Sequence, residues 1–119
     1  MKILIGEDRD EIILLVREIL ESHGHEVIEA HDGAEVIAFA KGFKIDLILM
    51  DIMMKGMSGV EAIDKLRKNL HTKYIPIIAL TARAQAGERE EILKLGFDDY
   101  LAKPFMSEDL IFHINKFKK

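Results

Sequence analysis

Short apolar runs alternate along the chain with longer segments in which apolar residues recur at helical spacing. Runs such as KILIG and DLILM are rich in Ile and Leu and have the length of strands. Such runs predict strands at 2–6, 26–30, 46–50, 74–80 and 98–102. The segments between them predict helices at about 9–23, 33–43, 59–70, 85–95 and 107–117. The chain is therefore expected to alternate strand and helix five times.

Local signals support several of these helices. Glycine occurs where three of them should end, at Gly24, Gly42 and Gly96. Ser107, followed by Glu108 and Asp109, is a favourable start for the fifth helix. The third helix is expected to bury an apolar stripe of Val60, Ile63, Leu66 and Leu70.

Repeated strand–helix units with nearly continuous apolar strands predict an α/β fold with a parallel sheet covered by helices on both faces. Right-handed crossovers then favour an open, doubly wound sheet, because a closed barrel of this type needs eight units. Five strands suit the flavodoxin-like order 2-1-3-4-5, with five helices around the sheet.

Length and composition narrow the classes of function. The 119 residues suit one domain over 1–119, and 17 basic against 21 acidic residues give a net charge of −4, which disfavours a nucleic-acid binder. Cysteine is absent, which excludes thiol chemistry and suits the cytoplasm. The sequence has no long apolar run and no secretory signal, so we expect neither membrane contact nor export.

Polar residues follow four of the five predicted strands. Glu7 and Asp8 follow the first strand, Asp51 the third, Thr81 the fourth and Lys103 the fifth. In open parallel sheets, ligands bind beyond the carboxyl ends of the strands, where the strand order reverses. Here that point lies between the first and third strands, so these side chains are expected to share one edge of the sheet.

Three carboxylates at neighbouring strand ends would repel one another. At about 5 Å and an effective dielectric constant of about 20, each pair costs roughly 3 kcal/mol. A hard divalent cation would relieve this repulsion, and oxygen ligands in an open site favour Mg²⁺. With Lys103 and Thr81 beside it, such a site can hold a phosphoryl group.

Each residue also has an ordinary structural interpretation. Asp8 could cap the first helix, Thr81 could form a turn, and Lys103 could be a solvated charge. Their joint occurrence at the expected strand ends is harder to explain by loop chemistry alone. We therefore treat the set as a candidate site.

At these residues the chain resembles the receiver domain of two-component response regulators, including the chemotaxis receiver. The resemblance covers the whole chain and depends on four motifs together: ILIGED, KIDLILMDIMMKGMSG, LTA at 80–82 and YLAKPF at 100–105. It implies that Asp51 is the phosphoacceptor, taking a phosphoryl group from a phosphohistidine on a sensor histidine kinase or histidine phosphotransferase. It also implies that Mg²⁺ is held by Glu7, Asp8, Asp51 and the main-chain carbonyl of Met53.

The resemblance assigns the remaining roles as well. Lys103 would pair with Asp51 and then with the phosphoryl oxygens, and the Lys103–Pro104 peptide would be cis. Thr81 would bond a phosphoryl oxygen and Tyr100 would turn inward behind it, although Tyr100 can equally be a half-buried aromatic residue of the sheet. This rearrangement of Thr81 and Tyr100 would alter the face formed by the fourth helix, the fifth strand and the fifth helix, which a downstream effector protein would bind.

Two residues depart from the family pattern. Glu7 stands where Asp is more usual, and its extra methylene favours metal contact through water. Lys55 stands where proline is common. It is either a tolerated loop substitution or an ammonium that reaches the acidic pocket.

The first helix carries an apolar run at positions 12–16 that is too wide for one buried face. We expect Ile13 or Leu14 to face outward and to form part of a docking patch for the histidine-bearing partner. His23, His25 and His31 match no usual metal-ligand spacing and are interpreted as solvated loop residues.

The leading hypothesis is a phosphorylation switch that does not turn over an external substrate, acting as a monomer or weak dimer. A degenerate receiver that binds partners without phosphorylation is the alternative. An aspartate-dependent phosphatase is disfavoured because Met53 stands where a second acid is usual. Flavin and dinucleotide binding are disfavoured because GEDRDE lacks a glycine-rich cradle. Whether the chain acts alone or belongs to a longer regulator stays open.

Overall fold

A computed structural model describes residues 1–82 and 88–118 of the chain. The strands are β1 (Lys2–Gly6), β2 (Glu26–Ala30), β3 (Leu47–Asp51), β4 (Ile77–Thr81) and β5 (Asp99–Ala102). The helices are α1 (Asp10–Ser22), α2 (Gly33–Gly42), α3 (Gly59–Lys68), α4 (Glu88–Lys94) and α5 (Ser107–Asn115). All strand pairs are parallel and the order is β2-β1-β3-β4-β5, which confirms the predicted flavodoxin-like fold.

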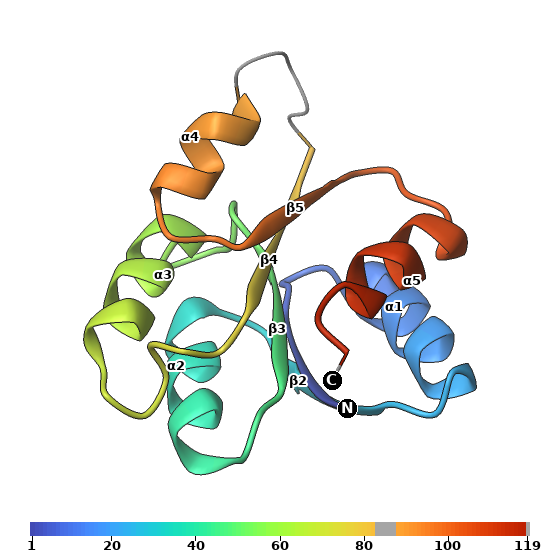
Figure 1. The fold of residues 1–119 in the computed structure, drawn as a ribbon, viewed down its shortest axis with the longest axis horizontal. Coiled ribbons are helices and arrows are strands. Elements are labelled where there is room, and N and C mark those ends of the chain that lie inside the picture. Colours follow the sequence, from blue (N-terminus) through green and yellow to red (C-terminus); the bar gives the residue numbers. More distant parts are fainter. Residues whose placement is uncertain (83–87, 119) are drawn as a thin grey trace.

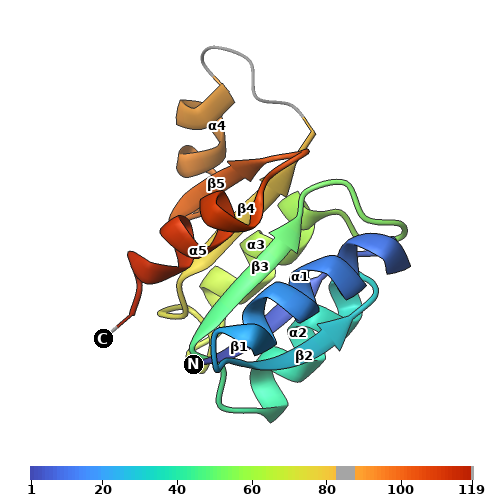
Figure 2. The same ribbon diagram turned by 90° about the vertical axis from the view of Figure 1, so that its right-hand side faces the viewer.

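The helices cover both faces of the sheet. Figure 1 shows α1 and α5 on one side and α2 and α3 on the other, and Figure 2 shows α1 and α5 in front of the strands. Successive residues of a strand point to opposite faces, so each strand supplies both layers. In β3, Ile48 and Met50 enter the core with α2 and α3, whereas Leu47 and Leu49 enter the core with α1 and α5. The central strands are therefore apolar along nearly their whole length.

Several boundaries differ from the sequence prediction. β4 begins at Ile77 rather than at residue 74, because Pro76 has no N–H to donate and Tyr74 is exposed. α3 ends at Lys68, which leaves Leu70 exposed and outside the helix. Val60 is also exposed, so the predicted stripe on α3 is confirmed only for Ile63 and Leu66. The predicted start of the fourth helix, at 85–87, lies outside the described residues.

The predicted helix signals are confirmed in part. Gly24 and Gly96 adopt positive φ angles of 84° and 115° two residues after the last residues of α1 and α4, whereas Gly42 is the last residue of α2. Ser107 is the first residue of α5 rather than its cap. The N–H of Met106, before it, donates to the Asp109 carboxylate.

The outward face of α1 corrects one prediction. Ile13 is 1% exposed and packs toward the sheet with Val16 and Leu20, which follow it at helical spacing. The prediction that Ile13 belongs to an outward patch is therefore wrong. Leu14 is 65% exposed and Leu15 is 47% exposed, so these two leucines supply the apolar surface of the helix. Among the described residues, no helix has the length and apolar character needed to cross a bilayer.

The start of α3 is packed closely against the end of β3, where the polar residues gather. Gly59 donates its N–H to the Ile52 carbonyl at 2.8 Å. A Cβ atom at Gly59 would lie 2.7 Å from the Asp51 carbonyl oxygen and 2.7 Å from the Ile52 Cα. Both are backbone atoms, which cannot move aside as a flexible side chain can.

We therefore expect Gly59→Ala to lower the free energy of unfolding by about 1–3 kcal/mol, the usual cost of overpacking. Urea denaturation measures this change. Gly42→Ala is the matched control, because a Cβ there meets no atom within 4 Å. Equal stability of the two variants would contradict the close approach of α3 to Asp51.

Candidate functional site

Three carboxylates meet at the carboxyl ends of β1 and β3. Glu7 and Asp8 directly follow β1, and Asp51 is the last residue of β3, the neighbouring strand. One carboxylate oxygen from each of the three residues lies within 4.8 Å of the other two. Glu7 and Asp51 are buried, and Asp8 is half-buried. The structure thus brings together the three acids that the sequence placed at one edge.

Lys103 balances part of this charge. Its Nζ donates to Glu7 Oε1 at 2.5 Å and to Asp51 Oδ2 at 2.8 Å, and its side chain is only 13% exposed. Its main-chain N–H donates to the Thr81 carbonyl at 2.7 Å, which ties the end of β5 to the end of β4. The Lys103–Pro104 peptide is cis, as predicted.

Main-chain N–H groups complete the hydrogen bonding of the acids. Asp51 Oδ1 accepts from the N–H of Met53 at 2.9 Å, and Glu7 Oε2 accepts from the N–H of Asp8 at 3.0 Å. Asp8 Oδ2 accepts from the N–H of Lys55 at 2.9 Å, across 47 positions of the sequence. The Lys103 ammonium and these three peptide N–H groups therefore help to hold the cluster.

The buried acids differ in how readily they ionise. Burial raises the pKa of Glu7 to about 7, because its contact with Lys103 only partly offsets the lost hydration and the proximity of Asp51. Burial acts in the same direction on Asp51, but hydrogen bonds from Lys103, Glu7 and the Met53 N–H outweigh it and lower the pKa of Asp51. The pKa of Lys103 is raised, because its two carboxylate partners outweigh its own desolvation.

The donor set suits a hard cation. Three acids face one ammonium group, so the cluster keeps excess negative charge when all three are ionised. Carboxylate oxygens are the ligands that Mg²⁺ prefers, and partly exposed Asp8 leaves the cluster open on one side. Met53 follows Asp51 by two residues, and its predicted carbonyl contact with a metal stays a prediction.

The two residues predicted to act as a switch lie on β4 and β5. Thr81 is buried at the end of β4, where its carbonyl accepts the Lys103 N–H. Tyr100 is half-buried and packs against the core on the α2 and α3 side of the sheet. Thr81 therefore lies beside the acidic cluster, whereas Tyr100 lies on one face of the sheet.

Two polar clusters were not predicted from the sequence. Buried Asp99 accepts from Lys116 Nζ at 3.1 Å and lies 2.6 Å from His113 Nδ1, which joins β5 to α5. Arg67 of α3 donates to the carbonyls of Lys73, Ile75 and Gly96 and to Asp98. For the first cluster the sequence held one signal, the three-residue spacing of His113 and Lys116. Their acidic partner, Asp99, lies on β5, so that spacing alone did not reveal the contact.

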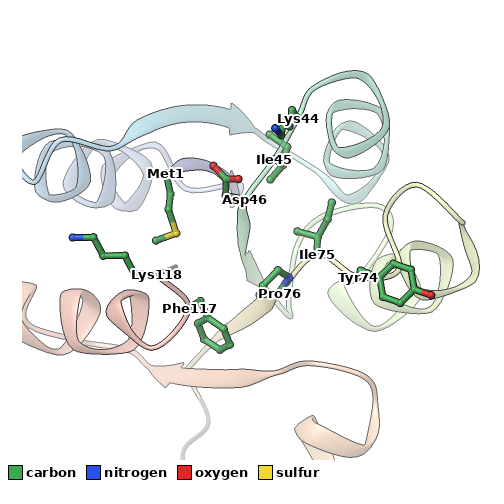
Figure 3. A pocket seen from close by; sticks show the side chains of 9 residues that line it. All are labelled: Met1, Lys44, Ile45, Asp46, Tyr74, Ile75, Pro76, Phe117 and Lys118. Carbon is green, nitrogen blue, oxygen red and sulfur yellow. The ribbon is translucent and has the colours of Figure 1, made fainter.

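A separate cleft lies at the opposite end of the sheet. It has a volume of about 510 Å³ and is formed where β1, β3 and β4 begin (Figure 3). Its lining is largely apolar and includes Ile45, Ile75, Pro76 and Phe117, with Asp46 as its one acidic residue. The acidic cluster with Lys103 lies at the other end of the sheet, at the carboxyl ends of the strands.

The raised pKa of Glu7 predicts how stability depends on pH in the presence of a chelator. A folded-state pKa near 7, against 4.5 for a free side chain, means that the contribution of Glu7 to stability is present below about pH 4.5 and is lost as the pH rises through 7. Glu7→Gln keeps a neutral group at every pH. We expect the free energy of unfolding of Glu7→Gln to exceed that of the wild type by on the order of 2 kcal/mol at pH 8. At pH 5 the two free energies should be similar.

Urea denaturation across this pH range checks the prediction. Subtracting the wild-type free energy of unfolding from that of Glu7→Gln at each pH removes the contributions of the histidines, which the two proteins share. Glu18→Gln, on the exposed side of α1, is the control and should show no comparable pH dependence. A difference between Glu7→Gln and wild type that is the same at pH 5 and pH 8 would exclude the raised pKa.

Known proteins resemble the chain in sequence. The transcriptional regulatory protein CpxR of Escherichia coli K12 is 41% identical over 113 residues, which cover 95% of this chain and 47% of CpxR. The chain thus spans about half the length of this regulator and of several others that it matches. Protein PilH of Pseudomonas aeruginosa is 37% identical, and the match covers 96% of this chain and 94% of PilH.

Solved structures also resemble the chain in fold. Chemotaxis protein CheY4 of Vibrio cholerae has a TM-score of 0.91 and 31% identity, with 98% of both chains covered. The receiver domain of a sensor histidine kinase from Pseudomonas aeruginosa has a TM-score of 0.90 and 34% identity, with 98% of this chain and 95% of that one covered. That structure has a magnesium ion in its active-site cleft. The family model of the response regulator receiver domain matches residues 3–115, and the chain belongs to this family.

Proposed function

We propose that residues 1–119 act as one receiver domain in which Asp51 accepts a phosphoryl group from a phosphohistidine of a sensor histidine kinase or histidine phosphotransferase. The observation that carries the proposal is the position of the Asp51 carboxylate. It lies at the end of β3, beside two further acids and 2.8 Å from the Lys103 ammonium. Phosphoryl transfer depends mainly on positioning and charge stabilisation, which this arrangement can supply.

Glu7, Asp8, Asp51 and the carbonyl of Met53 are the proposed ligands of Mg²⁺. When bound, the ion supplies positive charge to the transferring phosphoryl oxygens and offsets the repulsion among the acids. The acidic cluster of this chain and the magnesium ion in the related receiver structure both support this assignment.

The proposed chemical step uses the buried carboxylate as a nucleophile. An oxygen of Asp51 attacks the phosphorus atom, the bond from phosphorus to the histidine nitrogen breaks, and the imidazole leaves with the electron pair. The product on this chain is an acyl phosphate. The lowered pKa of Asp51 keeps the carboxylate ionised at neutral pH, as a nucleophile must be.

Lys103 and Thr81 are proposed to hold the product. The Lys103 ammonium is already 2.8 Å from Asp51 Oδ2 and can follow the developing charge onto the phosphoryl oxygens. Thr81 is anchored nearby through its carbonyl, and we assign its hydroxyl to a phosphoryl oxygen. Movement of Thr81 would open space behind it for Tyr100, whose half-buried ring links the site to β5.

Receiver domains of two-component systems are signalling switches that interact with histidine kinases and downstream effectors rather than enzymes with an external substrate. For this chain, we propose α4, β5 and α5 as the face that changes for a downstream effector. Tyr100 on β5 is the proposed link between this face and Asp51. Asp99, which joins β5 to His113 of α5 and to Lys116 directly after that helix, would carry a shift of the strand to the helix.

The partner that carries the phosphohistidine is proposed to dock beside α1. Leu14 and Leu15 are exposed there, and a largely apolar cleft of about 350 Å³ runs between Leu15 and Phe105, next to Lys103. The surface therefore lies next to the proposed nucleophile. An apolar helix face on a partner would place its histidine within reach of Asp51.

Incubation with acetyl phosphate and Mg²⁺, followed by intact-mass measurement, tests the phosphoacceptor. We expect one added phosphoryl group on the wild-type chain and none in the presence of a chelator. Asp51→Asn should abolish the addition. Asp64→Asn, which changes an exposed acid on α3, should leave it intact. Persistent modification of the Asp51→Asn protein would place the nucleophile elsewhere.

Leu14→Ser tests the docking surface separately from the chemistry. We expect phosphoryl transfer from a phosphorylated histidine donor domain to slow about tenfold, as for loss of a hot-spot side chain worth roughly 1.4 kcal/mol, with the rate from acetyl phosphate unchanged. Leu70→Ser is the control, because Leu70 is even more exposed than Leu14 but lies beyond the far end of α3. Equal slowing with both donors, or slowing by the control, would reject this surface.

A further inference from the structure

The carboxylate of Asp8 is held differently from those of Glu7 and Asp51. Lys103 contacts the latter two through its ammonium group. Within the described part of the chain, the hydrogen bond to the Asp8 carboxylate comes instead from the main-chain N–H of Lys55, at 2.9 Å. One member of the acidic cluster thus depends on a peptide group of the loop between β3 and α3.

The loop that presents this N–H is braced on both sides of Lys55. Met54 is buried in the core beneath α2 and α3. Met57 packs against Gly33, where a Cβ atom would lie 2.9 Å from the Met57 carbonyl oxygen. Gly56 has a φ angle of 74°, in the left-handed region that favours glycine, and lets the chain turn between the two methionines. The donor is therefore fixed by packing before any ligand binds.

The side chain of Lys55 has no such role. It is exposed, and no ion pair joins its ammonium group to an acid in the part of the chain that the structure describes. The main-chain contact adds a third interpretation of Lys55 to the two given above, a tolerated loop substitution and an ammonium that reaches the acidic pocket. Proline, the residue expected here from the family resemblance, has no N–H and cannot make this contact.

We infer that the main-chain N–H of Lys55 positions Asp8 and thereby strengthens the binding of Mg²⁺. The inference rests on the proposed function, in which Asp8 is a ligand of the ion. A carboxylate has about four lone-pair sites, so one N–H donor leaves capacity for coordination. Loss of a hydrogen-bond partner that orients a ligand typically costs 10–100-fold in metal affinity.

Three proteins separate the peptide group from the side chain. Lys55→Ala removes the ammonium and keeps the N–H, whereas Lys55→Pro removes both. A third protein, in which an ester replaces the Met54–Lys55 peptide and the lysine side chain is retained, removes the N–H without a proline ring. Circular dichroism and thermal melting verify that each protein is folded, and the ester protein keeps the test valid if the proline variant does not fold.

Calorimetric titration with MgCl₂ gives the affinities. We expect Lys55→Ala to match the wild type within twofold, and the proline and ester proteins to bind about tenfold more weakly. Equal affinity of all four proteins, or equal weakening by alanine and the ester, overturns the inference alone. Failure of the wild-type chain to bind Mg²⁺ overturns the proposed function as well.

A second measurement requires no metal. In ¹⁵N-labelled protein with chelator, the amide proton of Lys55 should resonate downfield, as expected for a donor to a carboxylate, and should move upfield in Asp8→Asn. The amide proton of Glu61, which donates to the Ser58 hydroxyl away from the cluster, is the internal reference. An unchanged Lys55 resonance in Asp8→Asn shows that the N–H does not position Asp8.

Discussion

The ion pairs from Lys103 to Glu7 and Asp51 are the interactions on which the site depends. Without this ammonium, two buried carboxylates on adjacent strands would face each other in a low-dielectric environment, where repulsion of like charges is strong. With it, the pair is tolerated and Asp51 stays ionised, whereas Glu7 titrates near neutral pH. Two excess negative charges remain for a cation to balance when all three acids are ionised.

The sheet provides the geometry that makes this charge cluster possible. Apolar residues of the central strands fill both layers of the core, and β3 and β4 become polar only at their last residues, Asp51 and Thr81. Because β1 and β3 are neighbours, Glu7 and Asp8 meet Asp51 there, with Thr81 and Lys103 on the next strands. The same packing that stabilises the fold therefore positions the groups proposed for phosphoryl transfer.

The sequence allowed the strand order and the five polar residues at the strand ends to be predicted, because both follow from apolar periodicity and from the rule for parallel sheets. It failed for Ile13, since a run of five apolar residues does not reveal which of them faces the sheet. The contact between Lys55 and Asp8 could not be predicted, because every residue except proline offers the same main-chain N–H. Asp99 and His113 were missed since their pairing depends on tertiary contact between β5 and α5.

If Asp51 forms an acyl phosphate, chemical reduction of that bond identifies the residue that carries the phosphoryl group. The chain is treated with acetyl phosphate and Mg²⁺, reduced with borohydride, digested and sequenced by mass spectrometry. Reduction of an aspartyl phosphate converts that residue to homoserine. We expect homoserine at position 51 and nowhere else, and only when Mg²⁺ is present. Homoserine at position 8 or another aspartate, or none in a protein that carries the added phosphoryl group, would exclude an acyl phosphate on Asp51.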